Sequence, residues 1–114
     1  MEKQRKKEII TEYKQKKSTG GVYRIYNKET GKGFIKGDEN LEAVENRLLF
    51  SQKINSAFTI VMAREWAEYG PDCFAMEILE ETKIGDEESP RAFKDRLKKL
   101  EEKWKERYTP EQLY

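Results

Sequence analysis

Two stretches of the chain place apolar residues at helical spacing. In residues 41–54, Leu41, Val44 and Leu48 recur every three or four positions behind Asn40, whose side chain is suited to cap a helix. A later stretch follows Ser89 and Pro90, which suit a cap and a first turn, and repeats the spacing over a longer range: Phe93, Leu97, Leu100, Trp104 and Tyr108. Both patterns predict amphipathic helices whose apolar side packs against a core.

Two further helices are predicted from composition and end signals. Residues 58–69 read as a helix that Gly70 and Pro71 terminate, as a glycine followed by a proline commonly does. Residues 2–17 are rich in strong helix formers and carry only a narrow apolar stripe. We therefore expect the N-terminal helix to dock weakly and to be an addition to the core.

Three short segments read as strands. Residues 21–28 and 33–37 are rich in β-branched and aromatic residues, and the glycine-containing connection of about five residues between them predicts an antiparallel hairpin. Residues 73–80 alternate between two sides, as a strand does. The apolar residues that share one side of this third strand are Phe74, Met76 and Ile78.

The predicted order of elements is α-β-β-α-α-β-α. Three antiparallel strands flanked by helices make a small α+β fold. A chain of 114 residues has no room for two independent cores, so we expect one domain over residues 1–114. Within it, residues 1–17 form the added basic helix and residues 21–108 form the core.

Charge is distributed unevenly along the sequence. Charged residues make up 39% of the chain, yet the net charge is only +1. Residues 1–37 carry 11 Lys/Arg and 4 Asp/Glu, whereas residues 38–114 carry 12 and 18. This asymmetry fits a polyanion such as DNA, and it fits equally an attraction between the two parts of the chain. The candidate phosphate contacts lie on the first helix and the hairpin: Lys14, Lys16, Lys17, Arg24, Lys32 and Lys36.

Several common catalytic side chains are missing from the sequence. There is no histidine, which excludes a Ser-His-Asp triad, and the single cysteine, Cys73, excludes an internal disulfide and a cysteine-based zinc site. A lone cysteine suits a reducing compartment, so a cytoplasmic location is expected. No apolar run approaches the roughly 20 residues of a membrane span, and we expect neither a signal peptide nor a membrane partner.

Two short motifs resemble the signatures of the GIY-YIG nuclease family. Gly21-Val22-Tyr23 resembles the first signature, and Phe34-Ile35-Lys36-Gly37, eleven residues after Tyr23, stands where the family carries Tyr-Ile-Gly. Further along, residues 66–70 and 74–81 resemble the helix and third strand of phage-type homing endonucleases. Glu101 followed by Trp104 resembles the metal-binding Glu of the last helix. The resemblance runs from about residue 21 to residue 108.

This resemblance implies hydrolysis of DNA phosphodiesters with Mg²⁺ or Mn²⁺ as cofactor. It makes Tyr23 the general base and Glu101 the metal ligand, and it requires a cation or strong donor for the transition-state charge. Each residue also has a purely structural interpretation. Tyr23 is equally suited to packing between a strand and a helix, and Glu101 to pairing with Lys105 on a solvated helix face.

The sequence departs from the family pattern at several catalytic positions. Phe34 has no hydroxyl, Lys36 replaces a glycine, and Val44 and Leu48 stand where the family places Arg and His or Tyr. Arg47, three residues after Val44, could act as a displaced cation. Because losing one charge-stabilising group costs about 10²–10³ in rate, we expect a largely eroded site and a nucleic-acid-binding or regulatory role.

Two alternatives stay open at this stage. In the first, the chain is a metal-dependent endonuclease in which Tyr23, Arg47 and Glu101 converge on one metal. In the second, it is a protein-interaction module that uses the N-terminal helix as a docking arm.

Overall fold

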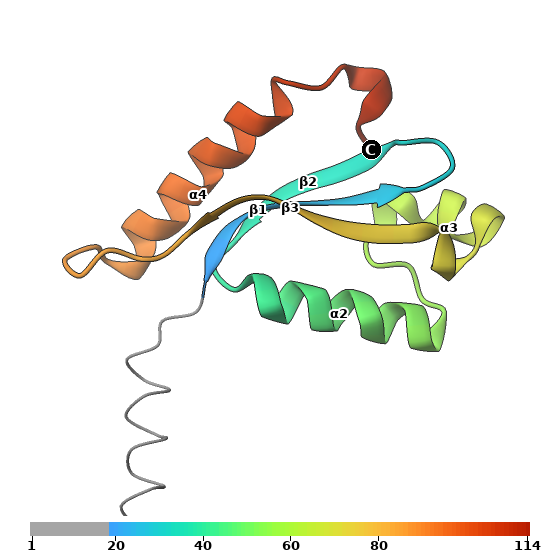
Figure 1. The fold of residues 1–114 in the computed structure, drawn as a ribbon, viewed down its shortest axis with the longest axis horizontal. Coiled ribbons are helices and arrows are strands. Elements are labelled where there is room, and N and C mark those ends of the chain that lie inside the picture. The colour runs from blue at the N-terminus through green and yellow to red at the C-terminus, as the bar shows by residue number, and fades with distance from the viewer. Residues whose placement is uncertain (1–18) are drawn as a thin grey trace, which may run out of the picture.

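The computed structural model describes residues 19–114, so the predicted helix over residues 2–17 lies outside the described part. Its centre is a sheet of three strands, β1 (Gly20–Asn27), β2 (Gly33–Asp38) and β3 (Phe74–Thr82), in the order β2-β1-β3. Both neighbouring pairs are antiparallel, and helices lie on the two faces of the sheet (Figure 1). The predicted α+β fold is therefore confirmed.

The predicted hairpin between the first two strands is confirmed, and Asn27 organises its turn. The Asn27 N–H donates to the Lys32 carbonyl at 2.8 Å, and the Asn27 carbonyl accepts from the Gly31 N–H at 2.7 Å. Its buried side-chain oxygen accepts from the Glu29 N–H at 2.8 Å. Gly31 adopts a φ of 78°, which a residue with a Cβ rarely takes.

Helix α2 (Leu41–Ile54) lies against one face of the sheet, with the bounds that its pattern predicts. The Asn40 side chain caps it by accepting from the Ala43 N–H at 3.0 Å. Its apolar positions pack against strand residues and against the segment that follows the helix. The main core contains Tyr23, Ile25, Leu41, Val44, Leu48, Phe58, Met62, Trp66 and Phe74.

The prediction of a helix over residues 58–69 is wrong at its start. Ile60–Met62 forms a 3₁₀ turn, η1, and the helix proper, α3, covers only Ala63–Tyr69. Thr59 is extended, with φ −145° and ψ 157°, and Phe58 turns its ring toward Tyr23. Burial of this ring and a run of β-branched residues, which lose rotamer freedom in a helix, delay the helix by five residues.

The predicted end of this helix at Gly70 is confirmed. The Gly70 N–H donates to the Trp66 carbonyl at 2.9 Å, and Gly70 takes a φ of 88°. Pro71 then begins a second 3₁₀ turn, η2 (Pro71–Cys73), which leads into β3. Trp66 stacks on Phe74 with ring centroids 4.8 Å apart, so the short helix is fixed to the sheet by its aromatic residue.

The last helix, α4 (Pro90–Lys105), covers the opposite face and packs on β2 and β1 (Figure 1). Ser89 caps it by accepting from the Ala92 N–H at 3.1 Å. Phe93 and Leu97 are buried, whereas the other members of the predicted stripe are half-buried. The helix comes so close that a Cβ at Gly37 would lie 2.8 Å from the Leu97 carbonyl oxygen.

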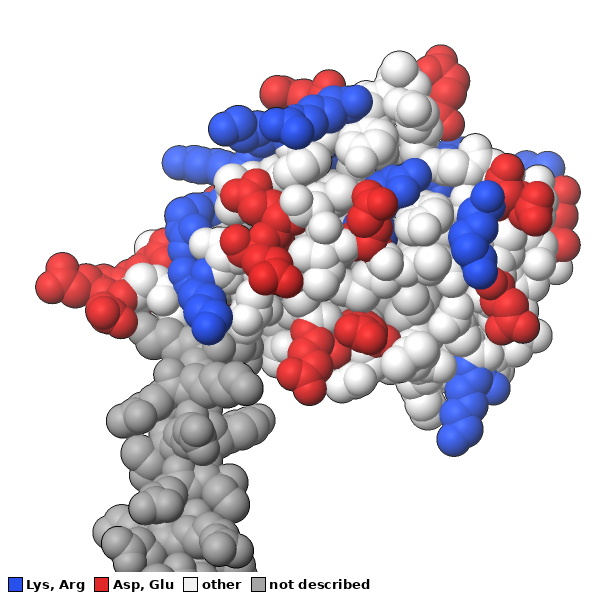
Figure 2. Space-filling model, in the orientation of Figure 1, with Lys and Arg blue, Asp and Glu red and all other residues white. Residues whose placement is uncertain are grey.

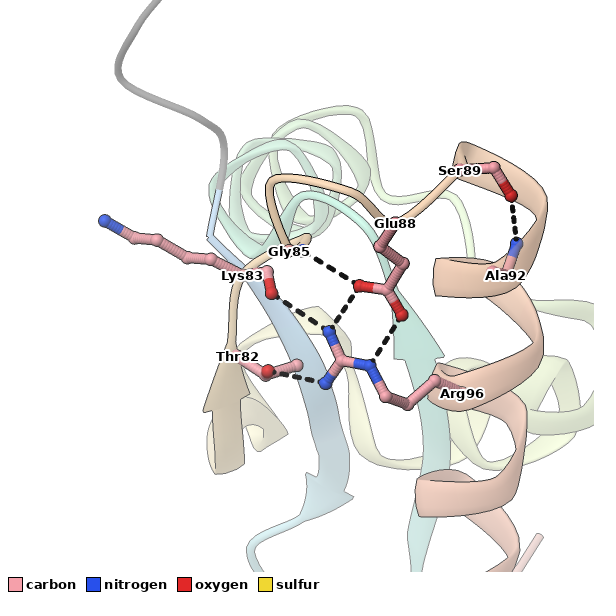
Figure 3. Close-up of polar contacts among 7 residues, drawn as sticks. All are labelled: Thr82, Lys83, Gly85, Glu88, Ser89, Ala92 and Arg96. Atoms are coloured by element: carbon pink, nitrogen blue, oxygen red, sulfur yellow. Dashed lines mark hydrogen bonds and ion pairs between the residues drawn. The ribbon is translucent and has the colours of Figure 1, made fainter.

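Arg96 fastens the loop between β3 and α4 (Figure 3). Its guanidinium donates twice to the Glu88 carboxylate, both at 2.9 Å, and also to the Thr82 hydroxyl at 2.8 Å and the Lys83 carbonyl at 2.9 Å. Glu88 accepts in addition from the Gly85 N–H at 2.9 Å. These hydrogen bonds stabilise the carboxylate and lower the pKa of Glu88 to about 2.

The C-terminal residues return to the start of β2. After the 3₁₀ turn η3 (Pro110–Gln112), the Tyr114 N–H donates to the Gly33 carbonyl at 3.0 Å. Its hydroxyl donates to Glu65, which also accepts from the Asn27 side chain, both at 3.1 Å. Among the described residues, no helix is long and apolar enough to cross a membrane.

Candidate functional site

Tyr23, the candidate general base, lies on the central strand and is completely buried. Its ring packs between Phe34 and Phe58, with centroids 6.4 Å and 6.3 Å away. Arg47 lies near the hydroxyl, but no group within residues 19–114 meets it in full hydrogen-bond geometry. The buried phenol therefore has the surroundings of a core aromatic residue and stands in the position of the first signature.

Burial raises the pKa of Tyr23 to about 12, because a phenolate would lose its hydration. The positive charge of Arg47 opposes this shift, and the negative charges of Asp38 and Glu101 add to it. The fold therefore brings these three charged residues close enough to Tyr23 for their fields to act on its hydroxyl. At neutral pH the side chain is a protonated phenol.

Arg47, the candidate substitute cation, extends from α2 over the same aromatic cluster. Its guanidinium lies 4.3 Å from the centroid of the Phe58 ring, which is a cation–π geometry, and its residue is exposed. Phe58 thus links the candidate cation to the candidate base. Sequence reasoning took Phe58 for a helical residue and missed this bridging role.

Glu101, the candidate metal ligand, joins α4 to β2. One carboxylate oxygen accepts from the Gly37 N–H at 2.9 Å. The other pairs with the Lys105 ammonium group, also at 2.9 Å, so the predicted pairing within the helix is confirmed. The neighbouring Trp104 donates its indole N–H to Glu80 on β3 at 2.7 Å. Both residues of the Glu-Trp motif therefore bind the last helix to the sheet.

A hollow of about 370 Å³ opens beside Glu101, between β2 and α4. Tyr23 is not among the residues that line it. Sequence reasoning missed two lysines on this hollow, Lys94 and Lys98, although their spacing of seven and three residues before Glu101 places them on the same side of the helix. The charged lining residues are Lys36, Asp38, Glu39, Lys94, Lys98 and Glu101.

The acidic side chains near the hollow are poorly arranged for a metal ion. Within the part of the chain that the structure describes, no group of three or more Asp, Glu or Cys side chains could hold one. Asp38 accepts from the Asn40 N–H at 2.9 Å, and Glu101 is occupied at both oxygens. A magnesium ion would have to displace Lys105 and then rely on one carboxylate, water and a substrate phosphate.

The candidate nucleic-acid contacts have different environments. Arg24 is largely enclosed: it donates to the Gly31 carbonyl and lies 4.4 Å from the Tyr26 ring centroid. Lys32 pairs with Glu65 at 3.8 Å, whereas Lys36 is exposed on the rim of the hollow. The three candidate lysines from the N-terminal segment, Lys14, Lys16 and Lys17, lie outside the described residues.

Comparison with solved structures identifies the fold. The chain is similar to the catalytic domain of the homing endonuclease I-TevI, with a TM-score of 0.58 and 20% identity over 77% of this chain and 86% of that one. It is equally similar to a mutant of the same domain of intron endonuclease I-TevI, at 20% identity and TM-score 0.58, over 78% of this chain and 82% of that one. No protein-family model and no curated protein matches the sequence. The fold is thus GIY-YIG-like, as the signature motifs predict.

Proposed function

We propose that this chain binds nucleic acid and has little or no capacity to cleave it. The nuclease-like fold makes DNA the first candidate for the polyanion. The observation that carries the proposal is the complete burial of Tyr23, which raises its pKa from 10 to about 12 and so moves it further from neutral pH. A general base works best when its pKa lies near the working pH, so this phenol is a poor acceptor for a proton from water.

Two neighbouring positions support the same proposal. Phe34 contacts Tyr23 and offers no hydroxyl to orient a water molecule or a phosphate. The Glu101 carboxylate is engaged by Gly37 and Lys105, and a metal ion fits this donor set poorly. A phosphate contact through lysines such as Lys36 needs neither a base nor a metal ion.

The test is an assay of supercoiled plasmid with Mg²⁺ or Mn²⁺ and the full chain. We expect the protein to retard the plasmid equally with and without a chelator and to leave it un-nicked. Tyr23→Phe and Glu101→Ala, with Tyr26→Phe and Glu102→Ala as matched controls, are expected to change neither result. Robust nicking that both site variants lose and both controls keep would overturn the proposal.

One observation favours a second candidate, a metal-dependent endonuclease with a displaced cation. The charge of Arg47 acts on the Tyr23 hydroxyl together with that of Glu101. In this reading Arg47 stabilises the transition-state charge, and Glu101 exchanges Lys105 for a metal ion. Nicking that disappears in Arg47→Gln as well as in Glu101→Ala would select this candidate.

A further inference from the structure

An open apolar groove lies between α2 and β3. It has a volume of about 340 Å³, and its walls include Leu48 and Leu49 of α2 with Met76 and Ile78 of β3. Leu49 is 55% exposed and Ile78 is 44% exposed, so both rims present apolar side chains to solvent. Beside them, β3 is an edge strand whose outer side has no partner strand within residues 19–114. Such a surface is typical of a binding site for another segment.

The N-terminal segment, residues 1–18, joins the fold at one end of this groove. The Thr19 carbonyl accepts from the N–H of Leu41, the first residue of α2, at 2.9 Å. Gly20 pairs with Thr82, the last residue of β3. The beginning of β1 therefore lies where α2 starts and β3 ends (Figure 1).

The tether is long enough to reach the groove. Leu49 is eight residues beyond Leu41, which corresponds to roughly 12 Å along a helix. Eighteen residues span roughly 27 Å even when fully helical. The segment can therefore turn back beside its own attachment point and cover both exposed rims.

The chemistry of the segment complements that of the groove. Residues 1–18 carry seven Lys/Arg and three Glu, and their apolar residues include Ile9, Ile10 and Tyr13. Exposed Glu45 of α2 lines the groove, and two more exposed acidic residues lie along the same two elements: Glu42, three residues before Glu45, and Glu81, three residues after Ile78. On the face drawn in Figure 2, acidic side chains lie over α2 and over β3 with uncharged surface between them.

A second copy of the described fold is a poorer occupant. Pairing two β3 edges would bring the glutamates of β3 in one copy against those of the other, and like charges across strands are destabilising. We infer that the groove between α2 and β3 is the docking site of the chain's own basic N-terminal segment. Ile9, Ile10 and Tyr13 would contact Leu49 and Ile78, and the lysines would face the acidic border. The inference does not depend on nucleic-acid binding.

Limited proteolysis of the full chain tests this docking, because trypsin cleaves at the seven basic residues of the segment. Mass spectrometry would follow the rate at which residues 1–18 are removed. We expect Leu49→Asp and Ile78→Asp each to accelerate this cleavage at least about fivefold, which corresponds to about 1 kcal/mol of docking free energy. Glu45→Lys, a fully solvated change, is expected to accelerate it as well.

The matched control is Ile60→Asp, since Ile60 is 88% exposed and does not line the groove. It is expected to leave the cleavage rate unchanged, and thermal melting would verify that each variant is folded. Dilution of the protein is expected to have no effect, because the segment and groove belong to one chain. Equal cleavage of the wild type and all groove variants, or protection that is lost on dilution, would overturn the inference.

Discussion

Tyr23 combines the position of a signature tyrosine with the surroundings of a core residue. Phe34 and Phe58 enclose its ring, and within the described residues the hydroxyl makes no hydrogen bond of full geometry, although Arg47 lies near it. A buried polar group without a partner costs free energy, because it gives up its hydrogen bonds to water. The hydroxyl therefore contributes nothing evident to the packing. Either it serves a function, or the fold tolerates the free energy that its burial costs.

The substitution Tyr23→Phe tests whether the hydroxyl is unpaired in solution. We expect it to raise the free energy of unfolding by up to about 1 kcal/mol, because it removes a desolvated hydroxyl and keeps the ring. Urea unfolding would measure the change, with Tyr26→Phe on the same strand as the control. A loss of more than about 1 kcal/mol would mean that the hydroxyl makes a stabilising hydrogen bond in solution.

At the scale of elements, local signals in the sequence predict the helices and strands correctly where tertiary packing favours the same structure. Asn40 and Ser89 cap the helices that they were expected to cap, and the hairpin follows from its turn. The segment around Phe58 differs, because burial of its ring overrides helix propensity, and no local pattern records a contact with Tyr23. The engagement of Glu101 with Gly37 was likewise unpredictable, since the two residues are 64 positions apart.

The loop from Lys83 to Glu88 depends on an ion pair that no periodicity reveals (Figure 3). The pKa of Glu88 is about 2 in the fold, against an ordinary value of 4.5. A depressed carboxyl pKa stabilises the fold above pH 4.5, and this contribution is lost as the pH falls from 4.5 toward about 2. We expect Glu88→Gln to lower the urea midpoint at neutral pH and to have little effect near pH 2.

Glu87→Gln, at the exposed neighbouring residue, is the matched control and is expected to leave the urea midpoint unchanged at every pH. Wild-type and Glu88→Gln curves that stay parallel from neutral pH down to pH 2 would contradict a role for the Glu88–Arg96 pair. In that case the contacts of Arg96 with Thr82 and Lys83, and not its pair with Glu88, would hold Arg96 to the loop.

At the scale of the whole molecule, the described fold is slightly acidic and the preceding segment is basic. Residues 19–114 contain 16 Lys/Arg and 19 Asp/Glu, whereas residues 1–18 contain 7 and 3. A polyanion would therefore be repelled by much of the folded surface and attracted mainly by the N-terminal segment. The same positive charge is what the acidic border of the groove attracts, so docking and nucleic-acid binding draw on one set of lysines.

This distribution predicts how binding responds to salt. Each phosphate contact contributes about 0.9 to the slope of log affinity against log salt concentration on duplex DNA. Replacing Lys14, Lys16 and Lys17 together by Gln is expected to lower that slope by up to about 2.7, and Lys36→Gln by about 0.9. Lys53→Gln, on the far end of α2, is expected to leave it unchanged. Fluorescence anisotropy with a labelled duplex would measure the slopes.

The substitution Arg24→Gln distinguishes phosphate contacts on the sheet from contacts on the N-terminal segment. Its guanidinium is committed to the Gly31 carbonyl and to the rings of Tyr26 and Tyr108, so Arg24→Gln is expected to destabilise the fold and leave the salt slope unchanged. A slope that falls for Arg24→Gln and not for the N-terminal lysines would place the phosphate contacts on the sheet. Nucleic-acid binding would then use the hairpin of β1 and β2, and the basic segment would serve only to dock in the groove.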